Sequence, residues 1–155
     1  MSKTRFEASA VIDARPEEIY AVLVDYRDTH PRIVPAGYLY NLKVEEGGYG
    51  AGTIFTYSTR IFGIENPARA VVSEPEPGRV LMETVSPMNF VTTFTMTPIA
   101  NGQQTHLTIA TAWPPARNLR ERLEHVIYPL VMKPMYTKEL ALIAAFMKSK
   151  NAQAV

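Results

Sequence analysis

The feature that most constrains the fold is a long run of short segments, from about Tyr38 to Trp113, in which apolar and polar residues alternate. A period of two places every second side chain on the same face, which is typical of β-strands. Turn-forming stretches at 47–52, 74–78 and 101–102 separate these segments at regular intervals,. The pattern therefore predicts an antiparallel meander of about six strands joined by short hairpins.

Another strand and one or two short helices precede this meander. Residues 6–12 come close to a period of two, which predicts the additional strand,. Pro16 follows at once, and proline suits the first turn of a helix. His30 is followed by a proline, which biases its backbone away from the helical region and predicts the end of the helical part. We therefore expect the short helices to interrupt the sheet after its first strand.

The C-terminal third of the chain has the periodicity of a helix. Apolar residues recur at steps of three and four through 119–131, and a second apolar run follows at 135–147,. Pro129 and Pro134 lie where the two runs meet, and each favours a bend because it removes a backbone hydrogen bond,. We predict one long, kinked helix over 115–148, whose stripe containing Leu123, Ile127 and Leu130 opposes the apolar face of the sheet.

Length and composition fit one α+β domain. The chain has 155 residues, of which 46% are hydrophobic and 20% are charged, a composition typical of folded proteins,. No linker or internal repeat interrupts it, so we assign residues 1–150 to a single domain and 151–155 to a disordered tail. An antiparallel sheet with one wet face needs an apolar cover on the other, which the long helix can supply. A strongly curved sheet cannot close down fully on such a helix, so we expect a gap between them.

Charge and cysteine content exclude several classes of partner. The formal net charge is +1, so no basic field would attract nucleic acid, and no window approaches the roughly 18 apolar residues that span a bilayer,. The chain has no cysteine, and its three histidines are far apart in sequence. We therefore expect no disulfide, no metal and no cofactor, and we assign the chain to the cytoplasm. The oligomeric state stays open.

Several stretches resemble one superfamily over nearly the whole chain. They are Asp13-Ala14-Arg15-Pro16-Glu17-Glu18-Ile19-Tyr20, Asp25-Tyr26, Gly50-Ala51-Gly52-Thr53, Glu74-Pro75-Glu76-Pro77-Gly78-Arg79-Val80, Thr92-Thr93-Phe94-Thr95 and Met135-Tyr136-Thr137-Lys138-Glu139-Leu140. With the order of elements, they are similar to the START-like, birch-pollen-allergen-like superfamily, also called SRPBCC, and within it to the bacterial polyketide cyclase/dehydrase type. The resemblance implies a helix-grip fold, a curved sheet wrapped around the C-terminal helix. These motifs are structural and not catalytic, and members similar in fold include carriers, cyclases and hydroxylase subunits.

Strand phase and helix phase together predict the lining of an internal cavity. Large aromatic and methionine side chains recur on one face of the strands, and buried tyrosine hydroxyls need polar partners, which a ligand or water can supply. The competing interpretation of each residue is ordinary core. The predicted ligand-binding residues are Tyr38, Tyr40, Phe55, Tyr57, Phe94, Met96, Trp113, Leu123, Ile127, Leu130 and Met135.

No catalytic motif is present, and the catalytic residues are left unassigned. His30 lies near the expected cavity mouth and is the best general-base candidate, although a surface or capping role is favoured over catalysis. Glu83 interrupts an apolar strand and is expected on the outer, wet face. If its side chain points inward, burial raises the pKa of its carboxyl. The glycine-rich stretch 47–52 joins two strands, which indicates a hairpin turn and not a phosphate-binding loop.

Three functions remain in competition. The chain binds a small, largely apolar or aromatic molecule, lipid-like or polyketide-like, in the cavity between sheet and helix. Alternatively, it is a cyclase, dehydratase or isomerase that uses the same cavity and moves protons without a metal. In the third interpretation it is a protein–protein adaptor with a vestigial cavity, whose sign would be a large exposed apolar patch.

Overall fold

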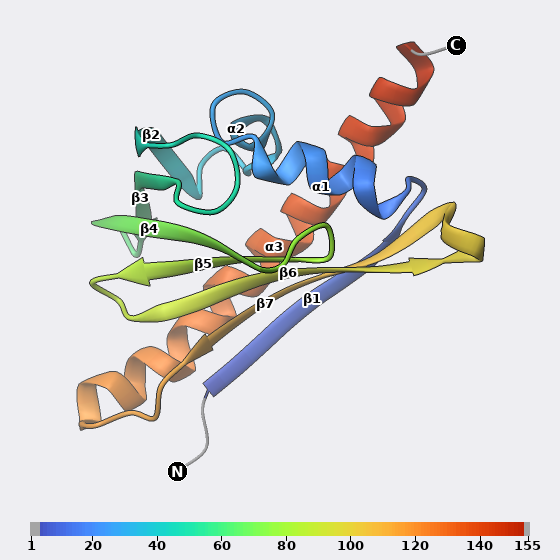
Figure 1. Ribbon diagram of the computed structural model, residues 1–155. Helices are drawn as coiled ribbons and strands as arrows, with labels where there is room; N and C mark the ends of the chain where they lie inside the picture. The colour runs from blue at the N-terminus through green and yellow to red at the C-terminus, as the bar shows by residue number, and fades with distance from the viewer. Residues whose placement is uncertain (1–3, 154–155) are drawn as a thin grey trace.

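The seven strands form one antiparallel sheet in the order β1-β7-β6-β5-β4-β3-β2 in the computed structural model, which describes residues 4–153 (Figure 1). The strands are β1 (Thr4–Ile12), β2 (Leu39–Glu46), β3 (Ile54–Ile61), β4 (Ile64–Glu76), β5 (Val80–Ser86), β6 (Phe90–Ile99) and β7 (Gln104–Trp113). β2 to β7 follow one another as a meander, and β1 pairs with β7 at the far edge. The predicted α+β, helix-grip architecture is confirmed.

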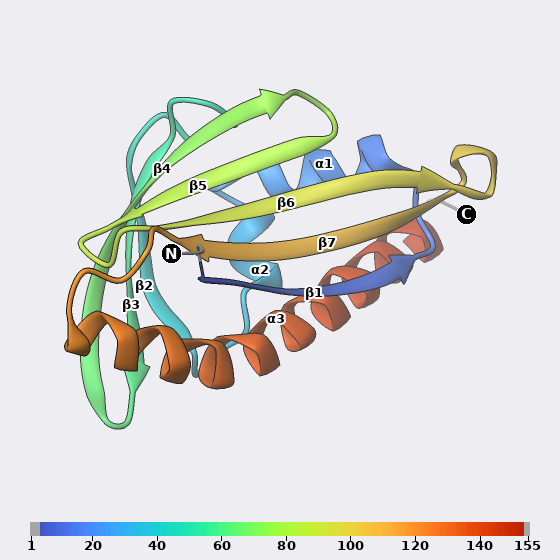
Figure 2. The same cartoon turned by 90° about the horizontal axis from the view of Figure 1, so that it is seen from below.

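Helices occupy the concave side of this sheet. The short helices α1 (Pro16–Val24) and α2 (His30–Ile33) follow β1, and the long helix α3 (Leu119–Gln153) ends the chain. Figure 2 shows the sheet arching over α3, which runs beneath it. α3 packs mainly along β1 and touches β7 and α2 less. The curved half of the sheet formed by β2, β3 and β4 therefore stands away from the helix.

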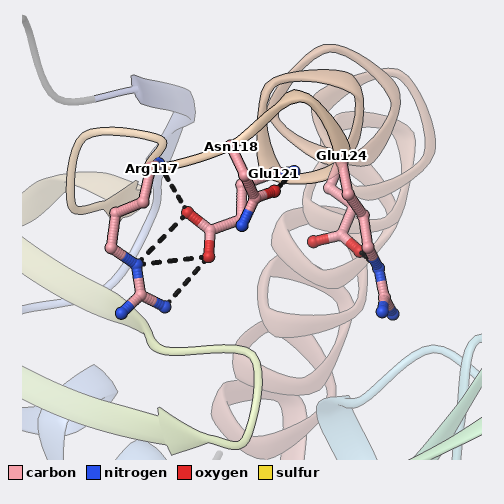
Figure 3. A network of polar contacts seen from close by, with 5 residues as sticks. Arg117, Asn118, Glu121 and Glu124 are labelled. Atoms are coloured by element: carbon pink, nitrogen blue, oxygen red, sulfur yellow. Dashed lines mark hydrogen bonds and ion pairs between the residues drawn. The ribbon is translucent and has the colours of Figure 1, made fainter.

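α3 is one continuous helix that contains Pro129 and Pro134. It continues through 151–153, which we had expected to begin a disordered tail; residues 154–155 lie outside the described residues. Its first turn is fixed by side chains, as Figure 3 shows: the Glu121 amide donates to Asn118 Oδ1 (2.9 Å), and Glu121 Oε2 accepts from the Arg117 amide (2.7 Å). These contacts satisfy amides that a helix start leaves without partners.

The apolar stripe on the first half of α3 faces outward, contrary to the sequence prediction. Leu123 is 59% exposed and Leu130 is 73% exposed, and Leu119 and Val126 are exposed with them. These four residues are called the outer stripe below. Ile127, at its edge, is half-buried. The prediction was wrong because this helix half has apolar residues on two opposite faces, and periodicity alone does not show which face is inward.

The turn between β2 and β3 is fastened to the helical segment after β1. The Tyr26 amide donates to the Gly48 carbonyl (2.9 Å), and the Gly50 amide donates to the Val24 carbonyl (2.9 Å). Gly50 has a φ of +57°, and a Cβ there would lie 2.4 Å from Glu74 Oε2, so this position favours glycine,. These bonds fix the segment that leads from α1 to α2 and so position Tyr26.

Two alanine substitutions in α3 test which of its faces is core. We expect Leu123→Ala, on the outer stripe, to change the free energy of unfolding by no more than about 0.5 kcal/mol. Ile143, in the second half of α3, is fully buried, so Ile143→Ala should cost about 2–5 kcal/mol. Urea unfolding followed by circular dichroism measures both. Similar losses in the two variants would mean that the outer stripe packs against the sheet.

Candidate ligand cavity

A cavity of about 70 Å³ lies between the concave face of the sheet and the inner face of α3. Its wall is largely apolar and aromatic, and Arg60, which is exposed, marks its opening. The helix contributes Tyr128, Val131, Met132, Met135, Tyr136 and Glu139, and the rest comes from α2, β2, β3, β5 and β6 with the adjoining turns. The face of α3 that lines the cavity is opposite the outer stripe.

Five of the residues predicted as ligand-binding line this cavity. They are Tyr38, Phe55, Tyr57, Phe94 and Met135. Strand alternation placed Phe55, Tyr57 and Phe94 on the concave face, as expected,. Whether any of them contacts a ligand stays a prediction.

The other six predicted residues lie outside the lining. Met96 and Trp113 are buried in the core, where Trp113 stacks near Phe6 with ring centroids 5.6 Å apart. The Tyr40 ring lies under the guanidinium of Arg60, 5.7 Å from its centroid, and its hydroxyl is buried without a hydrogen-bond partner among the described residues. The remaining three, on the first half of α3, are Leu123, Ile127 and Leu130.

Glu83 points into the cavity, and the expectation that it faces solvent was wrong. Its carboxyl accepts a hydrogen bond from the Tyr26 hydroxyl at 2.7 Å, and the residue is 9% exposed. Burial in apolar surroundings raises the pKa of Glu83 to about 7, and the hydrogen bond from Tyr26 offsets part of that rise,. The sequence held the signal: Glu83 shares its strand phase with Leu81 and Val85, both buried.

His30 is buried beside Glu83 and is not at the surface. Its Nδ1–H donates to the Leu23 carbonyl at 2.7 Å, so in the neutral ring Nε2 carries the lone pair,. Nε2 lies 3.8 Å from Glu83 Oε1. Burial lowers the pKa of His30 to about 4. Between about pH 4 and pH 7 the two groups therefore face each other mostly uncharged, and they do not form an ion pair.

A row of hydroxyls crosses the middle of the concave face. Glu83 pairs with Thr92 across β5 and β6, and Thr92 pairs with Thr111 across β6 and β7. The Thr92 and Thr111 hydroxyls are 2.8 Å apart, and the Tyr136 hydroxyl of α3 bonds to both. This network ties α3 to the sheet at the point where the cavity ends.

Glu139 is a second carboxyl in the same cavity. In the sequence it stood out only as a member of the family motif at 135–140. It is 4% exposed and lines the cavity, and no hydrogen bond from another described residue acts on the pKa of its carboxyl. Burial, and next the charge of Glu83, raise the pKa of Glu139 well above its usual value,. The signal was its spacing: Glu139 lies four residues after Met135 and four before Ile143, both buried.

Two further features of the described residues bear on possible partners. No three His, Asp or Glu side chains in residues 4–153 are grouped so that they could hold a metal ion. No helix in that part of the chain is long and apolar enough to cross a membrane.

The fold and this cavity define a helix-grip protein of the birch-pollen-allergen-like class. A sequence model of the family described as polyketide cyclase / dehydrase and lipid transport matches residues 3–147. The chain therefore belongs to the polyketide cyclase/dehydrase and lipid transport family, as the sequence motifs indicated. A search of curated proteins gave no match.

Solved structures similar to the chain share its fold at low sequence identity. The KanY protein is 21% identical with a TM-score of 0.81, over 96% of this chain and 99% of that one. Norcoclaurine synthase from Thalictrum flavum, in complex with dopamine and hydroxybenzaldehyde, is 11% identical with a TM-score of 0.72, over 96% and 88%. The Zhui aromatase/cyclase from a Streptomyces species is 13% identical with a TM-score of 0.71, over 95% and 92%.

The stability of Glu83→Gln relative to wild type should depend on pH. Because the pKa of Glu83 rises from 4.5 to about 7 on folding, the native state binds more protons than the unfolded state between these values. The contribution of Glu83 to the free energy of unfolding therefore falls as pH rises through this window, by roughly 3 kcal/mol in all. Glutamine keeps an acceptor for Tyr26 and does not titrate.

The advantage of Glu83→Gln in melting temperature should thus grow from pH 5 to pH 8. His30 changes stability in the opposite direction between about pH 4 and 6.5, because the unfolded state takes up its proton first. Comparing the variant with wild type at each pH cancels this contribution. Differential scanning fluorimetry gives both curves, and a pH-independent difference would show that Glu83 is not buried as an acid.

Proposed function

We propose that the chain binds a small, largely apolar or aromatic molecule in the cavity between the sheet and α3. The single observation that carries this proposal is an apolar, aromatic-walled cavity with a few buried polar groups, which is the usual makeup of a ligand site,. Phe55, Phe90 and Phe94 give the wall its aromatic area. The family's description, which includes lipid transport and polyketide chemistry, supports the proposal.

The size of the cavity limits what enters without rearrangement. A volume of about 70 Å³ has room for on the order of five water molecules,. A molecule with one or more rings therefore needs lining side chains to move. Met88, Met132 and Met135 are the adaptable members of the wall, because an unbranched thioether changes rotamer at low cost,. We expect a ligand to displace these methionines first.

A tryptophan at Val131 tests the proposal. Val131 is half-buried in the lining, so Val131→Trp should fill the cavity and lower the affinity for the uncharged dye N-phenyl-1-naphthylamine at least about tenfold. The indole enters only if the adaptable methionines of the wall move aside, which they do at low cost, so the loss in stability should not exceed the roughly 1–3 kcal/mol of an overpacked core. Fluorescence titration and thermal melting measure the two effects.

Val126→Trp is the matched control. Val126 lies on the same helix but on the outer stripe, 65% exposed. This variant should bind the dye as wild type does. If wild type binds no dye while Val131→Trp unfolds the protein, the space is ordinary core and the proposal fails. Equal dye binding by both variants would place the dye elsewhere on the surface.

Acid–base catalysis is a second candidate function, favoured by the presence of two carboxyls in one cavity. Glu83 has a pKa near 7, so at neutral pH part of it is a carboxylate that can take a proton, while Glu139 stays protonated and can donate,. In a ketone, Glu83 would remove the proton on the carbon next to the carbonyl, and Glu139 would hydrogen-bond the oxygen of the resulting enolate. Return of the proton restores both groups.

Proton exchange of a simple ketone tests this candidate without knowledge of the substrate. In deuterated buffer, the methyl group of acetophenone should exchange its protons faster with the protein than without it, and NMR follows the loss of signal. General acid–base catalysis typically contributes 10²–10⁴-fold, so Glu83→Gln should remove the acceleration almost wholly. Exchange at the buffer rate, with acetophenone bound, would leave binding as the function.

The outer stripe bears on the adaptor interpretation. Leu119, Leu123, Val126 and Leu130 are exposed together on one face of α3, and Phe62 is exposed at the turn between β3 and β4. This is the sign that would mark a protein–protein adaptor. Because the stripe lies opposite the cavity lining, an interface there would leave ligand binding possible.

A further inference from the structure

Three polar groups in the cavity wall have no hydrogen-bond partner among the described residues. The Thr59 hydroxyl is buried and unpaired, and the pKa values of Tyr57 and Glu139, both buried residues, are shifted by burial and by neighbouring charges with no hydrogen bond acting on either group. All three line the cavity. A polar group this deeply buried costs free energy unless a partner is supplied, and the cavity is the space where a partner fits.

These groups share one chemical property: when uncharged, each is a hydrogen-bond donor. Tyr57 keeps its proton because burial raises its pKa, and Glu139 keeps its proton for the same reason. The positive charges lie at the rim instead, where Arg60 is exposed and the Lys138 ammonium lies over the Tyr38 ring, 5.0 Å from its centroid. The interior therefore offers donors without a fixed charge.

We propose that the ligand is an uncharged, largely apolar molecule with an acceptor oxygen, such as a carbonyl, and that the Glu139 carboxyl donates a hydrogen bond to that oxygen. This inference rests on the proposed function, since it assumes that the cavity is occupied. Glu83 is less suited to the role because its carboxyl is already engaged by Tyr26. Glu139 therefore sets which molecules bind.

A protonated amine is the main competing ligand, and the surroundings of Glu139 disfavour it. An amine would require Glu139 to ionise in an interior where no described positive group is near, and a buried ion pair seldom repays the desolvation of both partners. The titratable groups around Glu139 are Glu83 on β5, Tyr57 on β3, Tyr136 on α3, Tyr26 and, beyond Glu83, His30 on α2. None of them carries a positive charge at neutral pH.

Three probes of nearly equal shape test the inference: acetophenone, its alkene isostere α-methylstyrene, and 1-phenylethylamine. Wild type should bind acetophenone roughly 3- to 10-fold more tightly than the alkene, which is the effect of one net hydrogen bond. Chemical-shift titration of the labelled protein gives the affinities. Competition against the dye confirms that each probe occupies the cavity.

Two variants of Glu139 separate hydrogen bonding from shape. Glu139→Leu removes the donor, so the preference for acetophenone should fall to about one. Glu139→Gln keeps an N–H donor and should keep the preference. In wild type the affinity for acetophenone should fall at high pH as Glu139 ionises, whereas the affinity of Glu139→Gln should change only near pH 7, where Glu83 ionises. Circular dichroism at each pH shows that the proteins remain folded.

Each remaining outcome has a definite meaning. Equal affinity of wild type for acetophenone and α-methylstyrene would overturn the inference and leave the proposed function intact. Tightest binding of 1-phenylethylamine, lost in Glu139→Gln, would overturn it in favour of a cationic ligand. A cavity that takes the dye but none of the three probes would also overturn it. If neither the dye nor any probe binds, the proposed function itself fails.

Discussion

The site depends on how the long helix α3 meets a twisted sheet. α3 is held along β1, at the edge of the sheet, and β1 is held in turn by β7 through a register that runs from Thr4–Trp113 to Ile12–Thr105. Because the sheet has a right-handed twist, each strand is rotated relative to the one before it. The strands beyond β7 therefore diverge more and more from the direction of α3. By β3 the separation is too large for side chains to close. The cavity thus forms because the long helix packs along one edge of a curved sheet.

The interior chemistry follows from the same geometry. His30, Glu83 and Glu139 come from three different elements, and all are buried next to one cavity. Burial disfavours the charged form of each, lowering the pKa of His30 and raising those of Glu83 and Glu139,. A buried charge left unpaired would cost far more than a buried neutral acid. The result is a cavity that is polar enough to orient a molecule and yet carries little fixed charge.

The fold could be predicted from the sequence because its signals are local. Alternation marked the strands, Asn101-Gly102 marked a hairpin, and apolar spacing marked the long helix. The concave face was also within reach, since Phe55, Tyr57 and Phe94 share strand phases with buried neighbours. Each of these features depends on residues a few positions apart.

The inner face of α3 could not be assigned from periodicity. Leu119, Leu123, Val126 and Leu130 form the more regular stripe, yet they are exposed, and the inner face is marked by a mixed set that includes Met135 and Glu139. A hydrophobicity scale gives the residues of the outer stripe higher values than the residues of the inner face. The inward face of α3 is determined by the position of β1 and of the hydroxyls to which Tyr136 bonds. These groups belong to strands that are distant from α3 in sequence.

The two halves of α3 differ in how firmly they are held. All of its fully buried residues lie from Met135 onward, and the half that runs from Leu119 to Pro134 is held by half-buried side chains such as Tyr128, which stacks on Trp113 with ring centroids 5.9 Å apart. Pro129 and Pro134 also each remove a backbone hydrogen bond from that half,. Segments with few buried contacts open at the lowest free energy. Because this half supplies Val131 and Met132 to the cavity wall, we expect it to adjust to a ligand before the second half does.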